Sequence, residues 1–257
     1  MRQIILHLGA PKSGSSAIQS ALYLNREILI ENGIDFPIRP GKRINKGIQP
    51  SNGNVNLLGV WLQRGHGELD IVFNHVLESD CQTVILSSER CHLFNHERLR
   101  AFLKYASSKG FTIRFCYYVR SIGDFIVAQR SQCARRLKTE KTGYNIKSPR
   151  FQNRIENLLK IAGAENVNVR SFDDAAQNLI HDFFLRGCFL SEEIVSKINF
   201  NLPRVNDSLK GREIVMMEYI GKFLQNPNQS EYISDIISSC NHGMSKRNAI
   251  PRHIATE

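Results

Sequence analysis

Several features that define other classes of protein are missing from this sequence of 257 residues. No apolar run approaches the length needed to cross a membrane. The six cysteines form no C-x-x-C pair, so the sequence indicates neither a zinc site nor a disulfide framework. The first residues enter a strand pattern without the regions of a signal peptide, and we therefore expect a reducing, cytoplasmic location.

The sequence also has one tryptophan and fewer acidic than basic residues. The single tryptophan, Trp61, is expected to pack inside the protein rather than form a platform for a ligand. Basic residues outnumber acidic ones by 34 to 24, and the formal net charge of +10 favours acidic partners. Aromatic and basic residues are not interleaved as they are on a nucleic-acid platform, so nucleic acid is not the expected partner.

Strand-like and helical segments alternate along the chain. Short apolar runs predict strands at residues 4–6, 82–86, 111–119 and 167–172, with a short extended piece at 33–37. Apolar residues at helical spacing predict helices over residues 18–29, 57–61, 69–77, 97–108, 124–137, 155–161, 179–185, 192–198 and 211–224. The alternation predicts an α/β fold with a mostly parallel central sheet and helices on both faces. We expect a single domain over residues 1–240 and a loose basic tail over 241–257.

The first predicted strand leads into a turn rich in glycine and serine, which opens a helix. Gly9 and Gly14 have the spacing of the phosphate-binding pattern G-x-x-x-x-G-K-[ST], but Ser15 stands where that pattern has lysine. The lysine of this chain is Lys12, two residues before the second glycine. Backbone N–H groups and the positive end of a helix point to one place in such a turn, which predicts an anion site. The alternative is an ordinary turn with a solvated lysine.

Three charged residues, Lys12, Glu89 and Arg120, each lie just beyond a different predicted strand. The carboxyl ends of parallel strands converge on one edge of a sheet. At that edge a lysine would stabilise charge on a leaving oxygen, and a carboxylate would take a proton from an acceptor hydroxyl or amine. An arginine would hold a second phosphate. The arrangement predicts group transfer from an anionic donor without a metal.

Each of these assignments has an alternative. Glu89 could cap the segment that follows it, and His92 could be the base instead. Arg120 could form a structural ion pair with Asp124.

The segment from Ala10 to Ser16 resembles the P-K-[ST]-G-[ST]-[ST] loop of sulfotransferases. In that family the loop binds the 5′-phosphosulfate end of 3′-phosphoadenosine-5′-phosphosulfate (PAPS). The resemblance implies that the donor is held by Pro11, Lys12, Ser13, Gly14, Ser15 and Ser16. The tripeptide ending in Glu89 resembles the S-S-E of bacterial and carbohydrate-type sulfotransferases, in which the glutamate is the base.

Arg120 resembles the arginine of a second sulfotransferase motif, where it binds the 3′-phosphate of the donor together with a serine eight residues later. The eighth residue here is Ala128, so either that hydroxyl contact is missing or Ser131 or Arg130 replaces it one helical turn further on. Weaker similarities extend the resemblance over residues 3–225, at 25–27, 33–37, 170–172, 182–183 and 205–209, with a possible remnant of a nucleotide-covering loop at 210–212.

The sequence therefore predicts a PAPS-dependent sulfotransferase with a P-loop-like nucleotide-binding core. The acceptor would be a hydroxyl or amine of a saccharide or other small molecule, and the product of the donor would be 3′,5′-adenosine bisphosphate. Residues 39–56 form a long loop that could bind the acceptor or be a solvated excursion. The alternatives are a nucleotide-dependent kinase, which would need the missing lysine and a magnesium-binding carboxylate, and a non-catalytic nucleotide-binding protein.

Overall fold

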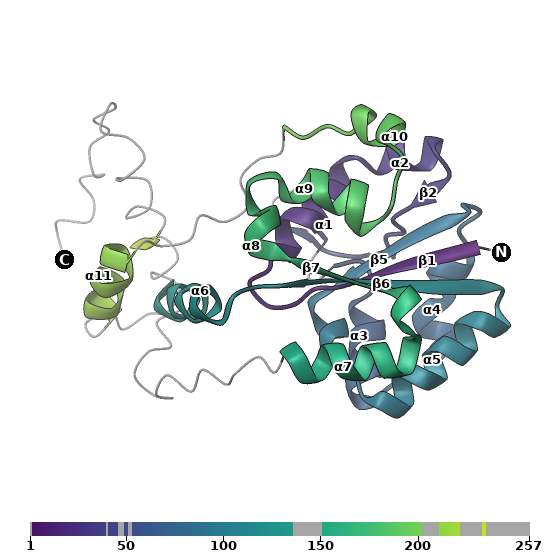
Figure 1. The fold of residues 1–257 in the computed structure, drawn as a ribbon, viewed down its shortest axis with the longest axis horizontal. Coiled ribbons are helices and arrows are strands. Elements are labelled where there is room, and N and C mark those ends of the chain that lie inside the picture. The colour runs from purple at the N-terminus through teal and green to yellow at the C-terminus, as the bar shows by residue number, and fades with distance from the viewer. Residues whose placement is uncertain are drawn as a thin grey trace. The chain divides into compact units, whose positions relative to one another are not determined.

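A computed structural model gives the fold of the chain (Figure 1). It describes residues 2–39, 41–45, 49–50, 53–135, 151–201, 211–221 and 233–234. The chain divides into two compact units, each of which is described by itself: Met1–Ile122 with Ser148–Val205, and Gly123–Lys147 with Asn206–Glu257. The single domain over residues 1–240 stays a prediction, and the basic tail over 241–257 lies outside the described residues.

The first unit is built on a sheet of five parallel strands. Their order in space is β2 (Ile34–Asp35), β5 (Thr83–Ser88), β1 (Arg2–Leu8), β6 (Phe111–Val119) and β7 (Val167–Ser171). A separate antiparallel pair joins β3 (Ile44–Asn45) and β4 (Gln49–Pro50). The central strand β1 is covered on both faces from Ile4 onward, and its neighbour β6 from Phe115 to Tyr118, which explains the apolar runs there.

Helices cover both faces of this sheet (Figure 1). One face packs against α3 (Asn56–Arg64), α4 (Leu69–Leu77), α5 (His96–Ser108) and α7 (Phe151–Ala162). The other packs against α1 (Ser15–Leu24), α2 (Arg26–Glu31), α9 (Leu179–Asp182) and α10 (Glu192–Lys197). Successive residues of β1 alternate between the two cores: Ile4 and Leu6 enter one, and Ile5 enters the other. The predicted α/β fold with a parallel sheet covered on both faces is confirmed.

The strand order reverses at β1. From β1 the chain passes to β2 and β5 on one side, and it then crosses to β6 and β7 on the other side. The helices that follow β1 and β5, namely α1 and α5, cover opposite faces of the sheet. In open α/β sheets, ligands bind outside the carboxyl ends of the strands at such a reversal. The turn after β1 therefore occupies the position where this fold places its ligands.

The predicted helix over residues 18–29 is two helices, α1 and α2, which meet at Asn25. The buried Asn25 side chain donates to the carbonyl of Asn199 at 3.1 Å and accepts the Asn199 N–H at 2.7 Å. These bonds tie the point where the two helices meet to the residues after α10, and the backbone N–H groups of Asn25 and Leu29 still donate to the carbonyls of Ala21 and Asn25.

The predicted helix over residues 179–185 is helical but divided between two elements, and two short helical pieces that were not predicted precede it. After β7 come α8 (Phe172–Ala175) and η3 (Ala176–Asn178), and α9 continues into the π-helical η4 (Phe183–Gly187). In η4 the N–H of Cys188 donates to the carbonyl of Phe183 at 2.7 Å, five residues back. The turn η1 (Glu89–Leu93) follows β5, and η2 (Ala164–Asn166) precedes β7.

The second unit contains α6 (Ile122–Arg135) and α11 (Gly211–Gly221). The first residue of α6, Ile122, is the last residue of the segment Met1–Ile122 of the first unit. Ala134, Ile214 and Met217 are buried together, and Ile233 packs against them. Both helices lie where the sequence predicts them, over the residues that the structure describes.

Candidate active site

The turn between β1 and α1 has an unusual backbone. Lys12 and Gly14 have φ angles of 62° and 76°, which lie in the left-handed region. A Cβ at Gly14 would lie 2.2 Å from Cδ2 of Leu179, so this position excludes a side chain by both conformation and space. Gly14 is also the N-cap of α1, and because it has no side chain it makes no side-chain cap bond to the first turn. The positive end of α1 is therefore free of a side-chain cap, as an anion site requires.

Two serines of the turn hold it together. The Oγ atoms of Ser13 and Ser15, both buried, donate to the carbonyl of Ala10 at 2.8 and 3.3 Å. Pro11 and Ser16 are half-buried on either side of them. Because the Ser13 and Ser15 hydroxyl protons are used inside the turn, these two residues would meet an anion through their N–H groups. The predicted roles of the four residues in binding the donor stay predictions.

Glu89 is the first residue of η1, directly after β5, and it is exposed. Its main chain lies against the turn that follows β1. A Cβ at Gly9 would lie 3.1 Å from both the N and the Cα of Glu89. This close approach explains the first glycine of the turn, and it places the carboxylate on the segment that borders the turn.

Arg120 follows β6 directly and reaches the turn as well. Its Nη1 donates to the carbonyl of Lys12 at 3.0 Å. Its guanidinium lies over the ring of Phe172, 5.0 Å from the ring centroid, and its Nε lies 3.8 Å from Oδ1 of Asp173. The Nε is buried and has no hydrogen-bond partner among the described residues. Asp173 accepts the N–H of Ser121 at 2.7 Å, which fixes the carboxylate beside Arg120.

The three charged residues follow three neighbouring strands, because β5, β1 and β6 are adjacent in the sheet. Arg120 donates a hydrogen bond to the main-chain carbonyl of Lys12, and Gly9, in the same turn, lies close to the main chain of Glu89. The structure therefore brings them to one edge, as the sequence predicts. The sequence reasoning missed Phe172 and Asp173, although both follow β7 and could have been found by the same rule.

Ser131 lies in α6, in the second unit, and is buried. Ala128 on the same helix is buried and Arg130 is exposed. The predicted contact of Ser131 or Arg130 with the donor stays a prediction.

His92 occupies the last turn of η1 and is only 8% exposed. Its Nδ1 contacts the carbonyl of Glu89, and its own carbonyl accepts a hydrogen bond from Arg154 of α7. Burial lowers the pKa of His92, the contact with the Glu89 carbonyl raises it by less, and the charge of Arg154 lowers it again, so that the pKa is about 4. The sequence did not predict a role for Arg154, because this arginine does not differ in pattern from any other charged residue on a helix.

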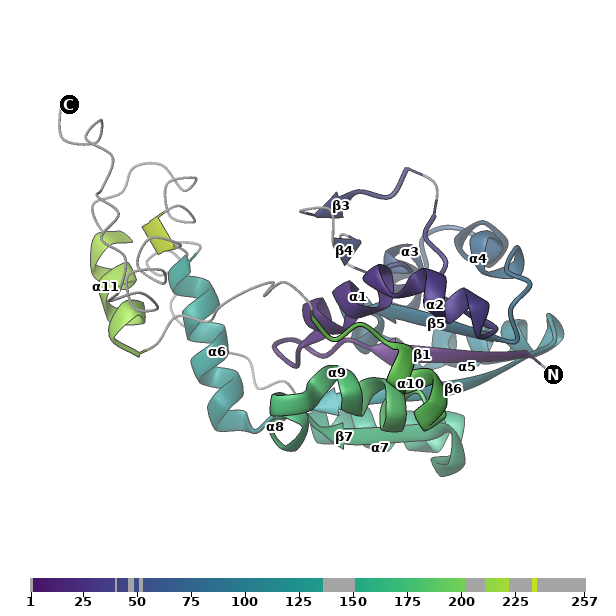
Figure 2. The ribbon, with the colours of Figure 1, turned by 90° about the horizontal axis from the view of Figure 1, so that it is seen from above.

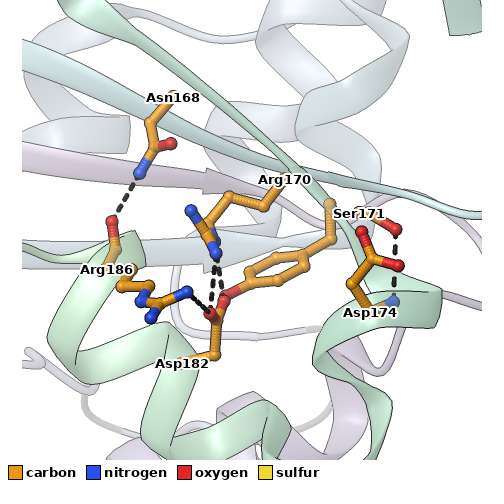
Figure 3. Close-up of polar contacts among 7 residues, drawn as sticks. Asn168, Arg170, Ser171, Asp174, Asp182 and Arg186 are labelled. Atoms are coloured by element: carbon orange, nitrogen blue, oxygen red, sulfur yellow. Dashed lines mark hydrogen bonds and ion pairs between the residues drawn. The ribbon is translucent and has the colours of Figure 1, made fainter.

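The end of β7 is fixed by a partly buried ion pair between Arg170 and Asp182 (Figure 3). Arg170 donates to both carboxylate oxygens of Asp182 at 2.7 Å, and the hydroxyl of Tyr118 donates to one of them at 2.6 Å. Burial raises the pKa of Asp182, but hydrogen bonds from Arg170 and Tyr118 lower it by more, so the net pKa is lowered. This pair holds α9 against β6 and β7 and so supports the adjacent segment that carries Phe172 and Asp173.

The long loop over residues 39–56 returns to the same part of the fold. Its strand β4 lies beside α1 (Figure 2), and Asn54 bonds to β5. A surface groove also lies along α4, lined by Arg39, Asp70, Ile71, Asn74, His75 and Glu78. Among the described residues of the loop, only Arg39 lines this groove, and none of the residues predicted for the donor or for catalysis does.

The described part of the chain also bears on membranes, metals and thiols. None of its helices combines the length and apolarity needed to span a bilayer. Its histidine, cysteine and acidic side chains nowhere form a group of three that could hold a metal ion. Its five cysteines, Cys81, Cys91, Cys116, Cys133 and Cys188, are all free thiols.

Comparisons with known proteins give a structural similarity at low sequence identity. No protein-family model matches the sequence, and no curated protein matches it. The crystal structure of a sulfotransferase from Alicyclobacillus acidocaldarius is similar over 86% of this chain and 93% of that chain, with 13% identity and a TM-score of 0.45. At this identity and score the similarity assigns no activity, and the function has to be inferred from the residues of this chain.

Proposed function

We propose that this chain is a sulfotransferase that moves a sulfuryl group from PAPS to a hydroxyl or amine of a saccharide or other small molecule. One observation carries the proposal: Lys12, Glu89 and Arg120 meet at the carboxyl ends of three adjacent strands, around an uncapped helix start. The resemblance of residues 10–16 to the sulfotransferase loop supports PAPS as the donor.

The residues present suit a donor with two anionic ends. The left-handed turn and the start of α1 offer N–H groups to the phosphosulfate end. Arg120 would hold the 3′-phosphate, because its buried Nε has no hydrogen-bond partner among the described residues and a phosphate oxygen would supply one. Asp173 and Phe172 orient the guanidinium for that contact. Ser131 is proposed as a further contact to the same phosphate.

The chemistry is an in-line displacement at sulfur. The acceptor oxygen or nitrogen forms a bond to sulfur, while the bond from sulfur to the bridging oxygen of the 5′-phosphate breaks. The electron pair stays on that oxygen of the leaving 3′,5′-adenosine bisphosphate, where the Lys12 ammonium stabilises it. Glu89 takes the proton of the acceptor. Positioning and charge stabilisation supply the rate enhancement, as they do in phosphoryl transfer.

Calorimetric titration with 3′,5′-adenosine bisphosphate tests the donor assignment. We expect binding to the wild type that weakens at least about tenfold in Lys12→Ala and in Arg120→Ala, because each loses a charge-assisted contact. Lys104→Ala and Arg100→Ala, on the exposed face of α5, are matched controls and should bind like the wild type. Binding of ATP with magnesium but not of the bisphosphate would instead indicate a kinase.

A further inference from the structure

Three buried polar side chains meet beneath the turn that follows β1. The Nδ1 of His7, on β1, lies 2.8 Å from the Oγ of Ser87, on β5, and the Nε2 of Gln19, on α1, donates to the same Oγ at 3.1 Å. His7 and Ser87 are paired in the parallel ladder, so their side chains share one face of the sheet. None of the three is more than 1% exposed. We call His7, Gln19 and Ser87 the Ser87 lock.

Three polar side chains in this buried position favour one defined hydrogen-bonded arrangement, which apolar side chains would not require. A buried polar group that loses its hydrogen bond costs about 1–3 kcal/mol, whereas apolar side chains would fill the space without that risk. The rings of Tyr118 and Phe183 contact the His7 imidazole at centroid distances of 6.2 and 5.4 Å and limit its rotation. Burial lowers the pKa of His7 to about 3, so the imidazole stays neutral near pH 7.

The main chain of Ser87 is held as firmly as its side chain. Its N–H donates to Oδ1 of Asn54 at 2.8 Å, and its carbonyl accepts the N–H of Asn54 at 3.1 Å. The Nδ2 of Asn54 donates to the carbonyl of Ile85 at 3.0 Å. The pairing of β2 with β5 covers Thr83 and Val84, and Asn54 extends it toward the carboxyl end.

Ser88 connects Ser87 to Glu89 and is itself held by hydrogen bonds. The carbonyl of Ser88 accepts the N–H of Gly9 at 3.2 Å, and its Oγ accepts the N–H of Arg90 at 3.2 Å and caps η1. Gly9 in turn lies against the main chain of Glu89. Each residue of the tripeptide 87–89 is therefore tied to the strand or turn that leads to Lys12.

We infer that the Ser87 lock is a positioning device: His7, Gln19 and Ser87 fix the main chain of Glu89 relative to the turn that carries Lys12. They thereby set the distance between the proton acceptor and the donor site. The role in transfer rests on the proposed function, whereas the effect on the Glu89 turn does not. The three residues act through Glu89 and are positioning residues, since they are buried beneath the turn.

The test compares Ser87→Ala with Ser20→Ala in the full chain. Ser20 adjoins Gln19 on α1, is equally buried, and its Oγ has no hydrogen-bond partner among the described residues. We expect amide hydrogen exchange of residues 88–93 to accelerate at least about tenfold in Ser87→Ala and less than about twofold in Ser20→Ala. His7→Leu should behave like Ser87→Ala. His7→Asn keeps a polar group near the Nδ1 position and should restore most of the protection.

Kinetics separates positioning from general destabilisation. With PAPS as donor, we expect kcat of Ser87→Ala to fall about tenfold, while the KM for PAPS and the affinity for 3′,5′-adenosine bisphosphate stay within about twofold of the wild type. Gln19→Met removes the hydrogen bond from Gln19 to Ser87 at similar side-chain volume. This variant is tested in place of Ser87→Ala if Ser87→Ala does not fold. Unchanged exchange of residues 88–93 in the folded variants would overturn the inference. The expected exchange differences, in a protein that neither binds the bisphosphate nor consumes PAPS, would support the lock and refute the proposed function.

Discussion

Glu89 and His92 are neighbours on one turn, and either could accept the proton of the acceptor. His92 is buried, its Nδ1 contacts the carbonyl of Glu89, and its pKa is lowered to about 4. An imidazole with so low a pKa is a weak base at pH 7, and burial keeps it away from an acceptor. The Glu89 carboxylate is exposed beside the turn that carries Lys12, so the arrangement favours Glu89.

Replacing Glu89 by glutamine tests this choice. Glu89→Gln keeps the size of the side chain but cannot accept the proton, so turnover of PAPS with a productive acceptor should fall by about 10²–10⁴-fold. Its affinity for 3′,5′-adenosine bisphosphate, measured by calorimetry, should stay within about twofold of the wild type because the donor contacts are intact. His92→Asn is the matched control and should retain most of the activity. The opposite pattern, an active Glu89→Gln and an inactive His92→Asn, would assign the base to His92.

The two buried histidines also make stability depend on pH. The pKa values of His7 and His92 are lowered to about 3 and about 4, whereas in the unfolded chain both return to 6.5. Below pH 6.5 the unfolded state therefore binds more protons, and the free energy of unfolding falls as the pH falls. His7 alone should account for a loss of about 2 kcal/mol at pH 5 relative to pH 7.

Urea unfolding between pH 7 and pH 5 measures this loss. The slope should be smaller in His7→Asn, which has no titrating group at that position. A stability that is constant over this range in the wild type would show that neither histidine is held in its neutral form.

The segment over residues 53–54 lies close to β5 because residue 53 is a glycine. Gly53 has a φ of 79°, and a Cβ there would lie 1.9 Å from the carbonyl oxygen of Ser87. Gly33 has a similar φ of 73°, but a Cβ there would have no atom within 4 Å. The two glycines therefore separate the cost of a left-handed backbone from the cost of a collision.

We expect Gly53→Ala to lower the free energy of unfolding by more than about 3 kcal/mol, because it adds a clash with backbone to the strain of a positive φ. Gly33→Ala should lower it by only about 1–2 kcal/mol, the cost of the left-handed conformation. Urea titration of both variants measures the difference. Equal losses would mean that residues 53–54 do not pack on Ser87 in solution.

Local sequence signals locate many of the elements, and long-range contacts account for several of the differences. The predicted helix over residues 69–77 and the predicted strand over 111–119 coincide with α4 and β6. The helical periodicity of the first segment and the apolar run of the second each end at a clear boundary in the sequence. The break at Asn25 was not predicted, because it depends on Asn199, 174 residues away. The π-helical turn of η4 was not predicted either, since an i→i+5 hydrogen bond has no period of its own in the sequence.

At the scale of the whole first unit, the candidate site could be predicted in part from one rule of parallel sheets. Residues that follow strands converge, and this rule places Lys12, Glu89 and Arg120 together. It does not give the strand order or the register. The contact of His7 with Ser87 depends on both, because the two residues are paired only when β1 lies beside β5. The contacts of Arg120 with Phe172 and Asp173 depend likewise on β7 lying beside β6.

We propose that this edge of the sheet binds a 3′-phosphorylated adenine nucleotide and that Arg120 holds its 3′-phosphate. The most direct test compares the affinities of 3′,5′-adenosine bisphosphate and 5′-AMP by calorimetry, in the wild type and in Arg120→Ala. The wild type should prefer the bisphosphate by about 10–100-fold, and the preference should drop to about threefold or less in the variant. Equal affinities in the wild type, or a preference that survives in Arg120→Ala, would contradict the account.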